Sequence, residues 1–102
     1  GVAPGLASDV EAAIQSMVAA LDRAVKEGAT DEDRRAYRET AMAAARIVPR
    51  PAQWRLAQAC AKGSDAVERA ARGEREGLRA LTDEAWQQAE DCVSLSRGYV
   101  PK

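Results

Sequence analysis

The two cysteines, Cys60 and Cys92, are the side chains in this sequence with the most distinctive chemistry. A pair of cysteines can form a disulfide, contribute to a metal site or supply a thiolate nucleophile. Cys60 lies in the stretch QACAKGSD, residues 58–65, inside a predicted helix and three residues before Gly63. The chemistry open to Cys60 therefore depends on what packs against this helix.

The remaining residue types argue against catalysis and metal binding. The chain has no histidine, which is the commonest general base and the commonest transition-metal ligand. Cys60 lies in mid-helix, away from the helix N-terminus that would lower the pKa of a thiol. The acidic runs at residues 31–33 and 90–91 lack the spacing of a calcium-binding loop. We therefore expect no enzymatic activity, no metal and no cofactor.

The positions of the two cysteines favour a disulfide between them. The helices that carry them are joined by the short turn GEREG, residues 73–77, and should pack antiparallel. If the turn is centred on residue 76, Cys60 lies opposite Cys92 and Gly63 lies opposite Ala89. Small residues here would let the helices approach closely enough for a disulfide, whose Cα atoms lie about 5.5–6 Å apart.

A Cys60–Cys92 disulfide has consequences for stability and location. It would stabilise a small core and would imply an oxidising compartment, so that the protein would be secreted, periplasmic or on the cell surface. The alternative is a pair of free, buried and inert thiols in a cytoplasmic protein.

Helix start and stop signals place four helices along the chain. Thr30 precedes three acidic residues and predicts a helix N-terminus, and Pro49 ends that helix. Thr82, followed by two acids, predicts the start of the last helix, with at most one irregular helical turn just before it. The four predicted helices cover residues 8–28, 30–48, 51–73 and 82–98.

Short connections and the absence of strand-like alternation predict an all-α, up-down-up-down four-helix bundle. A chain of 102 residues forms one core, and we expect a single domain at residues 8–98, a flexible N-terminal segment at 1–7 and a tail at 99–102. With 23 alanines and no phenylalanine, the core is thin. It therefore needs close helix approach, a covalent link or a partner.

Charge and hydropathy exclude some classes of partner. The chain has 15 basic and 16 acidic residues in scattered positions, so no overall field attracts nucleic acid or an anionic membrane. No apolar run approaches the roughly 20 residues of a membrane span. We therefore expect a protein partner or a homo-oligomer.

One segment resembles a DNA-binding motif. Residues 56–74, LAQACAKGSDAVERAARGE, are similar to the helix-turn-helix of phage-repressor-like regulators. Lys62 departs from the motif at a buried turn position, and Gly63 replaces the usual Ser or Thr cap, which favours one continuous helix instead. Four residues match its Leu-Ala start, its apolar anchor and its terminal glycine: Leu56, Ala57, Val67 and Gly73.

Four large side chains are candidate interface residues: Tyr37, Met42, Trp54 and Trp86. The two tryptophans are expected in the core rather than at an interface, because so few other large side chains are present to fill it. The sequence favours a non-catalytic, extracytoplasmic helical module that binds another protein or itself. The alternatives are a cytoplasmic DNA-binding regulator that uses residues 56–74, or a carrier of a small hydrophobic ligand between helices.

Overall fold

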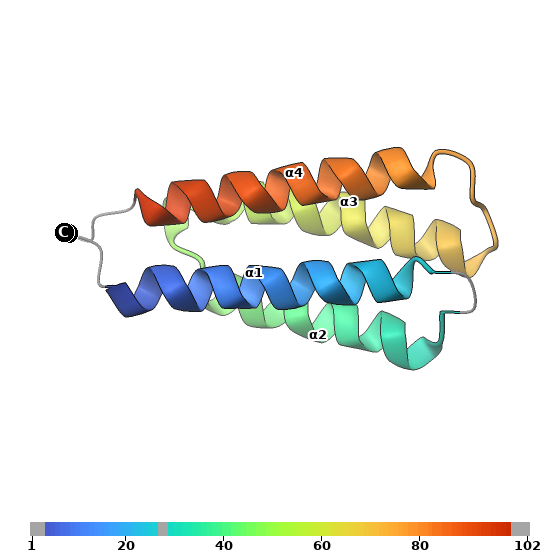
Figure 1. Cartoon of the computed structure of the whole chain (residues 1–102), viewed down its shortest axis with the longest axis horizontal. Helices are drawn as coiled ribbons and strands as arrows, with labels where there is room; N and C mark the ends of the chain where they lie inside the picture. Colours follow the sequence, from blue (N-terminus) through green and yellow to red (C-terminus); the bar gives the residue numbers. More distant parts are fainter. Residues whose placement is uncertain (1–3, 27–28, 99–102) are drawn as a thin grey trace.

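The computed structural model describes residues 4–26 and 29–98, which form four helices and contain no strand. The helices run up, down, up and down, so that α1 lies beside α4 on one side of the bundle, and α2 and α3 form the other side (Figure 1). The α1–α2 and α3–α4 hairpins are the most closely packed pairs, whereas α2 and α3 touch little. The elements are α1 (Pro4–Ala24), α2 (Asp31–Ile47), the 3₁₀ turn η1 (Arg50–Ala52), α3 (Gln53–Ala71) and α4 (Leu78–Arg97).

Local signals fix both ends of α2 and the C-terminal end of α3 as predicted. Thr30 and Asp33 form a capping box, with Thr30 N 3.0 Å from the Asp33 carboxylate and Asp33 N 3.1 Å from the Thr30 hydroxyl. The last helical residue of α3 is followed by Arg72 and then by Gly73, which has φ +77°. Glu74 N donates to Arg69 O across this left-handed turn, which is a Schellman cap.

The starts of three helices differ from the sequence prediction. Helix α3 begins at Gln53, two residues after the predicted start at Pro51, because Arg50–Ala52 form a 3₁₀ turn. Helix α1 begins at Pro4, four residues before Ser8, so that residues 4–7 of the predicted flexible segment are helical. Helix α4 begins at Leu78 rather than Thr82, directly after Gly77, which has φ +74°. The Thr82 hydroxyl donates to Leu78 O within the helix and caps nothing. Helix α1 also ends at Ala24, earlier than the predicted end near residue 28. Three predicted features lie outside the described ranges: the lead-in at 1–3, the glycine at residue 28 and the tail at 99–102.

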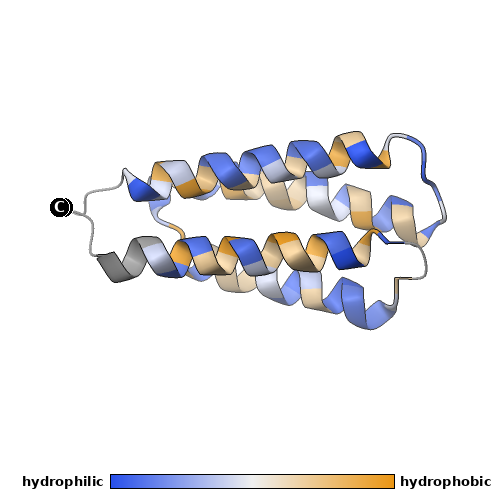
Figure 2. Cartoon of the chain, in the orientation of Figure 1, coloured by the Kyte–Doolittle hydropathy of each residue, from blue (hydrophilic) through white to orange (hydrophobic). Residues whose placement is uncertain are grey.

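The core is as thin as the composition suggests. Hydrophobic and hydrophilic residues alternate along the helices (Figure 2), and the buried hydrophobic ones form a single cluster. Helix α1 supplies four of the larger apolar side chains of the core, and alanines occupy many of the other core positions. The four are Val10, Ile14, Met17 and Leu21. Tyr37 of α2 is only 4% exposed and is the largest buried side chain among the described residues.

Gly63 makes room for Tyr37. A Cβ atom on Gly63 would overlap the Tyr37 hydroxyl and lie 2.8 Å from its Cζ atom. The tyrosine hydroxyl donates to Cys60 O at 3.5 Å, one turn earlier on α3. The sequence predicted that Gly63 lies opposite Ala89 and allows α4 to approach closely. This prediction is wrong, because the side chain that packs against Gly63 is Tyr37 of α2.

The predicted disulfide is not present, since Cys60 and Cys92 are both free thiols. The register of the α3–α4 hairpin explains why. Arg55 pairs with Asp91 at 3.5 Å, and Lys62 pairs with Glu84 at 3.1 Å. This register places Cys60 opposite residue 86, six residues from Cys92 or about 9 Å along the helix axis.

The register changes because the chain turns earlier than expected. The Schellman cap reverses the chain at Gly73 rather than at residue 76. Residues 74–77 then follow the direction of α4 before that helix begins. Arg75 donates a hydrogen bond to Val25 O, just after the end of α1, at 2.8 Å. The expected extracytoplasmic location depended on the disulfide and therefore has no support from the structure.

We predict that Gly63→Ala lowers the free energy of unfolding by about 1–2 kcal/mol, because overpacking at Tyr37 outweighs the better helix propensity of alanine. Urea denaturation followed by far-ultraviolet circular dichroism measures this loss. In a Tyr37→Leu background, which lacks the crowding ring atoms, the same substitution should be neutral or stabilising. An equal loss in both backgrounds would show that Tyr37 is not the cause.

Candidate functional site

The four predicted interface residues do not form one surface. Tyr37 is buried. Met42, Trp54 and Trp86 are exposed on three different helices, at 53%, 55% and 39% respectively. The prediction that both tryptophans lie in the core is therefore wrong. Trp54 is two residues before buried Leu56, a rotation of about 200° around the helix that turns it away from the core.

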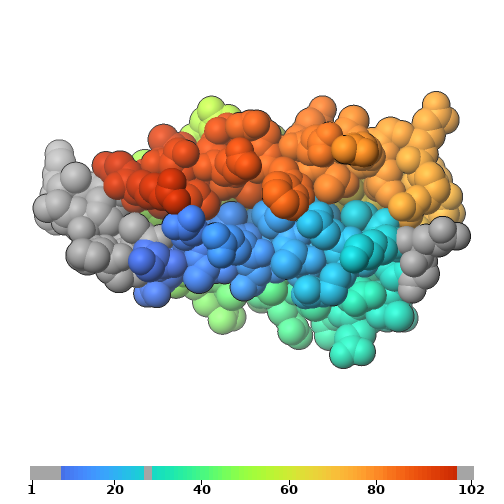
Figure 3. All heavy atoms as spheres, viewed as in Figure 1, coloured from blue at the N-terminus to red at the C-terminus, as the bar shows by residue number. Residues whose placement is uncertain are grey.

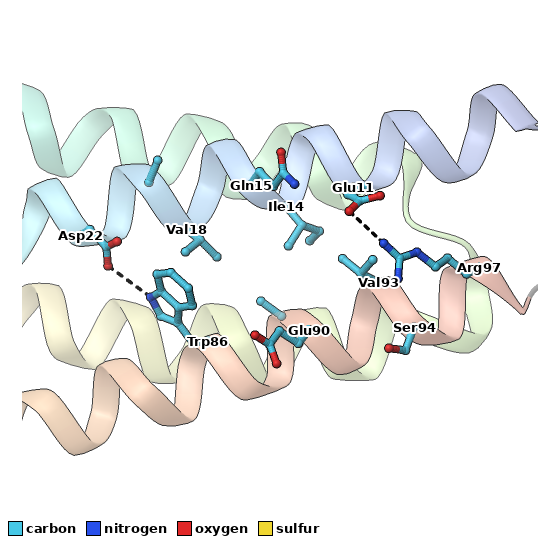
Figure 4. Close-up of a pocket in the computed structure, with 12 residues that line it drawn as sticks. Glu11, Ile14, Gln15, Val18, Asp22, Trp86, Glu90, Val93, Ser94 and Arg97 are labelled. Carbon is cyan, nitrogen blue, oxygen red and sulfur yellow. Dashed lines mark hydrogen bonds and ion pairs between the residues drawn. The ribbon is translucent and has the colours of Figure 1, made fainter.

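A groove follows the seam between α1 and α4. This seam runs along the face of the molecule shown in Figure 3, and the side chains that line it are drawn in Figure 4. The groove has a volume of about 540 Å³. Its lining residues are Glu11, Ile14, Gln15, Val18, Ala19, Asp22, Trp86, Ala89, Glu90, Val93, Ser94 and Arg97.

The floor of the groove is apolar. Ile14 and Ala89 belong to the buried core, and Val18 and Val93 are partly buried against it. These residues come from the edges of the apolar stripes of α1 and α4, where alanines and valines do not fill the seam. The floor therefore offers hydrophobic surface along the axis of the bundle.

Polar contacts cross the groove near both ends (Figure 4). At one end, Arg97 of α4 donates to the Glu11 carboxylate of α1 at 2.8 Å. At the other end, the Trp86 indole N–H donates to Asp22 at 3.1 Å. Beyond this bond lies a second hollow of about 400 Å³, which also has Asp22 and Trp86 in its wall. Trp86 thus separates two hollows of the same seam.

The rim of the groove carries an excess of negative charge. Three carboxylates, those of Glu11, Asp22 and Glu90, face one guanidinium, that of Arg97. Glu90 is exposed and forms no ion pair with any of the described residues. An apolar floor with an acidic rim is complementary to a ligand that is apolar on one side and basic on the other.

The α2–α3 seam holds a smaller groove of about 330 Å³. Its wall includes Arg34, Arg38, Met42 and the Cys60 thiol, whose sulfur is 4.0 Å from the Met17 sulfur. Burial raises the pKa of the Cys60 thiol above its ordinary value. The neighbouring Tyr37 hydroxyl also has a raised pKa, first because of burial and then because of Cys60.

Neither thiol is activated for chemistry. Cys92 is fully buried, and this burial raises the pKa of its thiol, an effect that a hydrogen bond with Ser96 partly offsets. Both thiols are therefore protonated at neutral pH, whereas a nucleophilic cysteine needs a lowered pKa. The described residues contain no cluster of three or more His, Cys, Asp or Glu side chains placed to hold a metal ion.

The sequence interpretation missed the groove because it concentrated on large side chains. Its residues do leave a signal, since Glu11, Gln15, Val18 and Asp22 recur at steps of three and four along α1, as Trp86, Glu90, Val93 and Arg97 do along α4. Both series lie at the edge of a predicted apolar stripe. Leu95, 41% exposed on α4, is a further surface residue that was not singled out.

Comparison with known proteins gives no relative: no protein-family model, curated protein sequence or solved structure matches this chain significantly. In the described part of the chain, no helix combines the length and apolar character needed to cross a membrane. Residues 56–71 belong to one continuous helix, α3, with no turn at Lys62 or Gly63. The segment thus lacks the two-helix geometry of a helix-turn-helix.

We predict that native alkylation is slow for both thiols and faster at Cys60 than at fully buried Cys92. Because the thiolate is the reactive form, a raised pKa gives less thiolate at pH 8 than in the unfolded chain. The native rate should continue to rise at pH values where an exposed thiol has levelled off. Intact-mass time courses with and without denaturant measure this difference. A protein that accepts alkyl groups in denaturant only after reduction would contradict the free-thiol state.

Proposed function

We propose that this chain is a non-catalytic helical module that binds a helix of a protein partner in the α1–α4 groove. The observation that carries the proposal is the combination of an apolar floor, an acidic rim and a half-exposed tryptophan in one furrow. Grooves of this kind accept amphipathic helices, whose apolar residues at steps of three and four insert into the floor. Tryptophan is the residue type most enriched among energetically dominant interface contacts.

The length of the groove sets the length of the occupant. Glu11 and Asp22 mark its two ends on α1 and are eleven residues apart, or about 16 Å at the rise of an α-helix. A partner helix of about three turns therefore spans the groove. Its apolar face would cover Val18 and Val93, and its flanks would reach the rim carboxylates.

The charge of the rim favours a basic occupant. Most rim groups are exposed, so each ion pair contributes little affinity, on the order of 0.2–1 kcal/mol. Several such pairs together favour a lysine- or arginine-flanked helix over an acidic one and increase its rate of association. The hydrophobic-ligand alternative is supported only by volume, since the groove falls within the usual range of ligand pockets, about 300–1,000 Å³.

Two synthetic helical peptides of about fourteen residues test this proposal. Both carry the same leucine face, and their polar faces are lysine in one and glutamate in the other. In a Trp54→Phe variant Trp86 is the only tryptophan, so that its fluorescence reports occupation of the groove. We expect the lysine peptide to shift the emission of Trp86 and to bind about tenfold or more tightly than the glutamate peptide, with weaker binding in high salt.

Two matched variants locate the binding site. Glu90→Lys on the rim should weaken the lysine peptide about threefold or more. Glu76→Lys, in the α3–α4 turn and outside the lining of the groove, makes the same change in net charge and should have no effect. Equal binding of both peptides, or equal effects of both variants, would contradict a basic helix in this groove. A fluorescence response to small hydrophobic compounds but to neither peptide would favour the ligand-carrier alternative.

A further inference from the structure

Helix α2 presents a basic and partly apolar face to solvent. Five of its exposed residues recur at steps that place them on one side of the helix, and we refer to them as the α2 face: Arg35, Arg38, Met42, Ala45 and Arg46. Met42 is 53% exposed and is the largest apolar side chain of this face. None of the three arginines forms an ion pair with another described residue.

The α2 face has the chemistry that the α1–α4 groove would accept. Its apolar centre, Met42 and Ala45, is flanked by three arginines and one exposed carboxylate, Glu39, so its net charge is positive. The groove has an apolar floor, and its rim carries three carboxylates against one guanidinium, so its net charge is negative. The lengths also agree. Arg35 and Arg46 are eleven residues apart, which is the separation of Glu11 and Asp22 along the groove, about 16 Å in each case.

The two surfaces lie on different sides of the bundle. Figure 1 shows α1 and α4 in front and α2 behind them, so that a ligand in the groove leaves the α2 face uncovered. One copy can therefore use its groove for a second copy and its α2 face for a third. Such a contact joins two different surfaces and is heterologous, so that repeated addition gives a closed ring or an open chain.

We propose that the α1–α4 groove of one copy binds the α2 face of a second copy, so that the protein self-associates head to tail. This inference rests on the proposed function of the groove and names its occupant. Met42 of one copy covers the floor at Val18 and Val93 of the other, and Arg38 meets the rim carboxylate of Glu90. A contact between one helix and one groove buries little surface. The association is therefore weak and depends on protein concentration.

Sedimentation equilibrium over a wide range of concentrations tests the association, with circular dichroism to verify that each variant is folded. The wild-type mass should rise with concentration and fall again with added salt. Glu90→Arg weakens the groove and Arg38→Glu weakens the α2 face, so that each variant alone should need a protein concentration about threefold or more above that of the wild type to associate. An equimolar mixture should associate again, because the unchanged α2 face of the first variant fits the unchanged groove of the second and the two reversed charges also attract each other.

A charge exchange within one chain provides the rescue. The double variant Glu90→Arg, Arg38→Glu has both charges reversed, so the two surfaces are again complementary and self-association should return. A wild-type protein that stays monomeric overturns the inference, as does a symmetric dimer that survives Arg38→Glu or a mixture that forms no complex. If the wild-type protein is monomeric but still binds the lysine peptide, a second copy is excluded as the occupant of the groove. The proposed function of the groove then still holds.

Discussion

The scarcity of large apolar side chains is the constraint on which the rest of this structure depends. With alanine at many core positions, two helices of a hairpin can approach closely and exclude water from the line between them. The same small residues cannot also fill the space between two hairpins. The bundle is therefore tight within the α1–α2 and α3–α4 hairpins and hollow along the two seams that join them. The grooves result from the composition that makes the hairpins compact.

Tyr37 compensates for this scarcity at one seam. Its ring crosses from α2 to α3, and the glycine at position 63 accepts it where any other residue would obstruct it. The buried hydroxyl retains a hydrogen bond to the backbone, which offsets much of the cost of removing it from water. At the opposite seam the aromatic residue is Trp86, which stays at the surface with its N–H bonded to Asp22. The α2–α3 seam is thus partly filled by a buried aromatic ring, whereas the aromatic ring of the α1–α4 seam lies at the surface.

The sequence predicted the features that depend on neighbouring residues. Thr30, Pro49 and Gly73 act through backbone hydrogen bonds and φ angles within a few positions, so both ends of α2 and the C-terminal end of α3 could be read directly. The register of α3 against α4 depends on where the chain reverses, and a shift from residue 76 to Gly73 moved the cysteines apart. The groove was harder to predict, because it lies between two helices that are distant in sequence. It also depends on the space that the small side chains at the edges of these helices leave empty.

The hydrogen bond between Trp86 and Asp22 marks the boundary between the two hollows of the α1–α4 seam. The indole ring forms a shared wall between the groove and the hollow beyond it, and it is held there by one hydrogen bond at a water-exposed site. A rotamer change of this single side chain would join the two hollows into one channel that continues toward Leu78. A longer binding surface would thus require the rotation of one side chain and no movement of the helices.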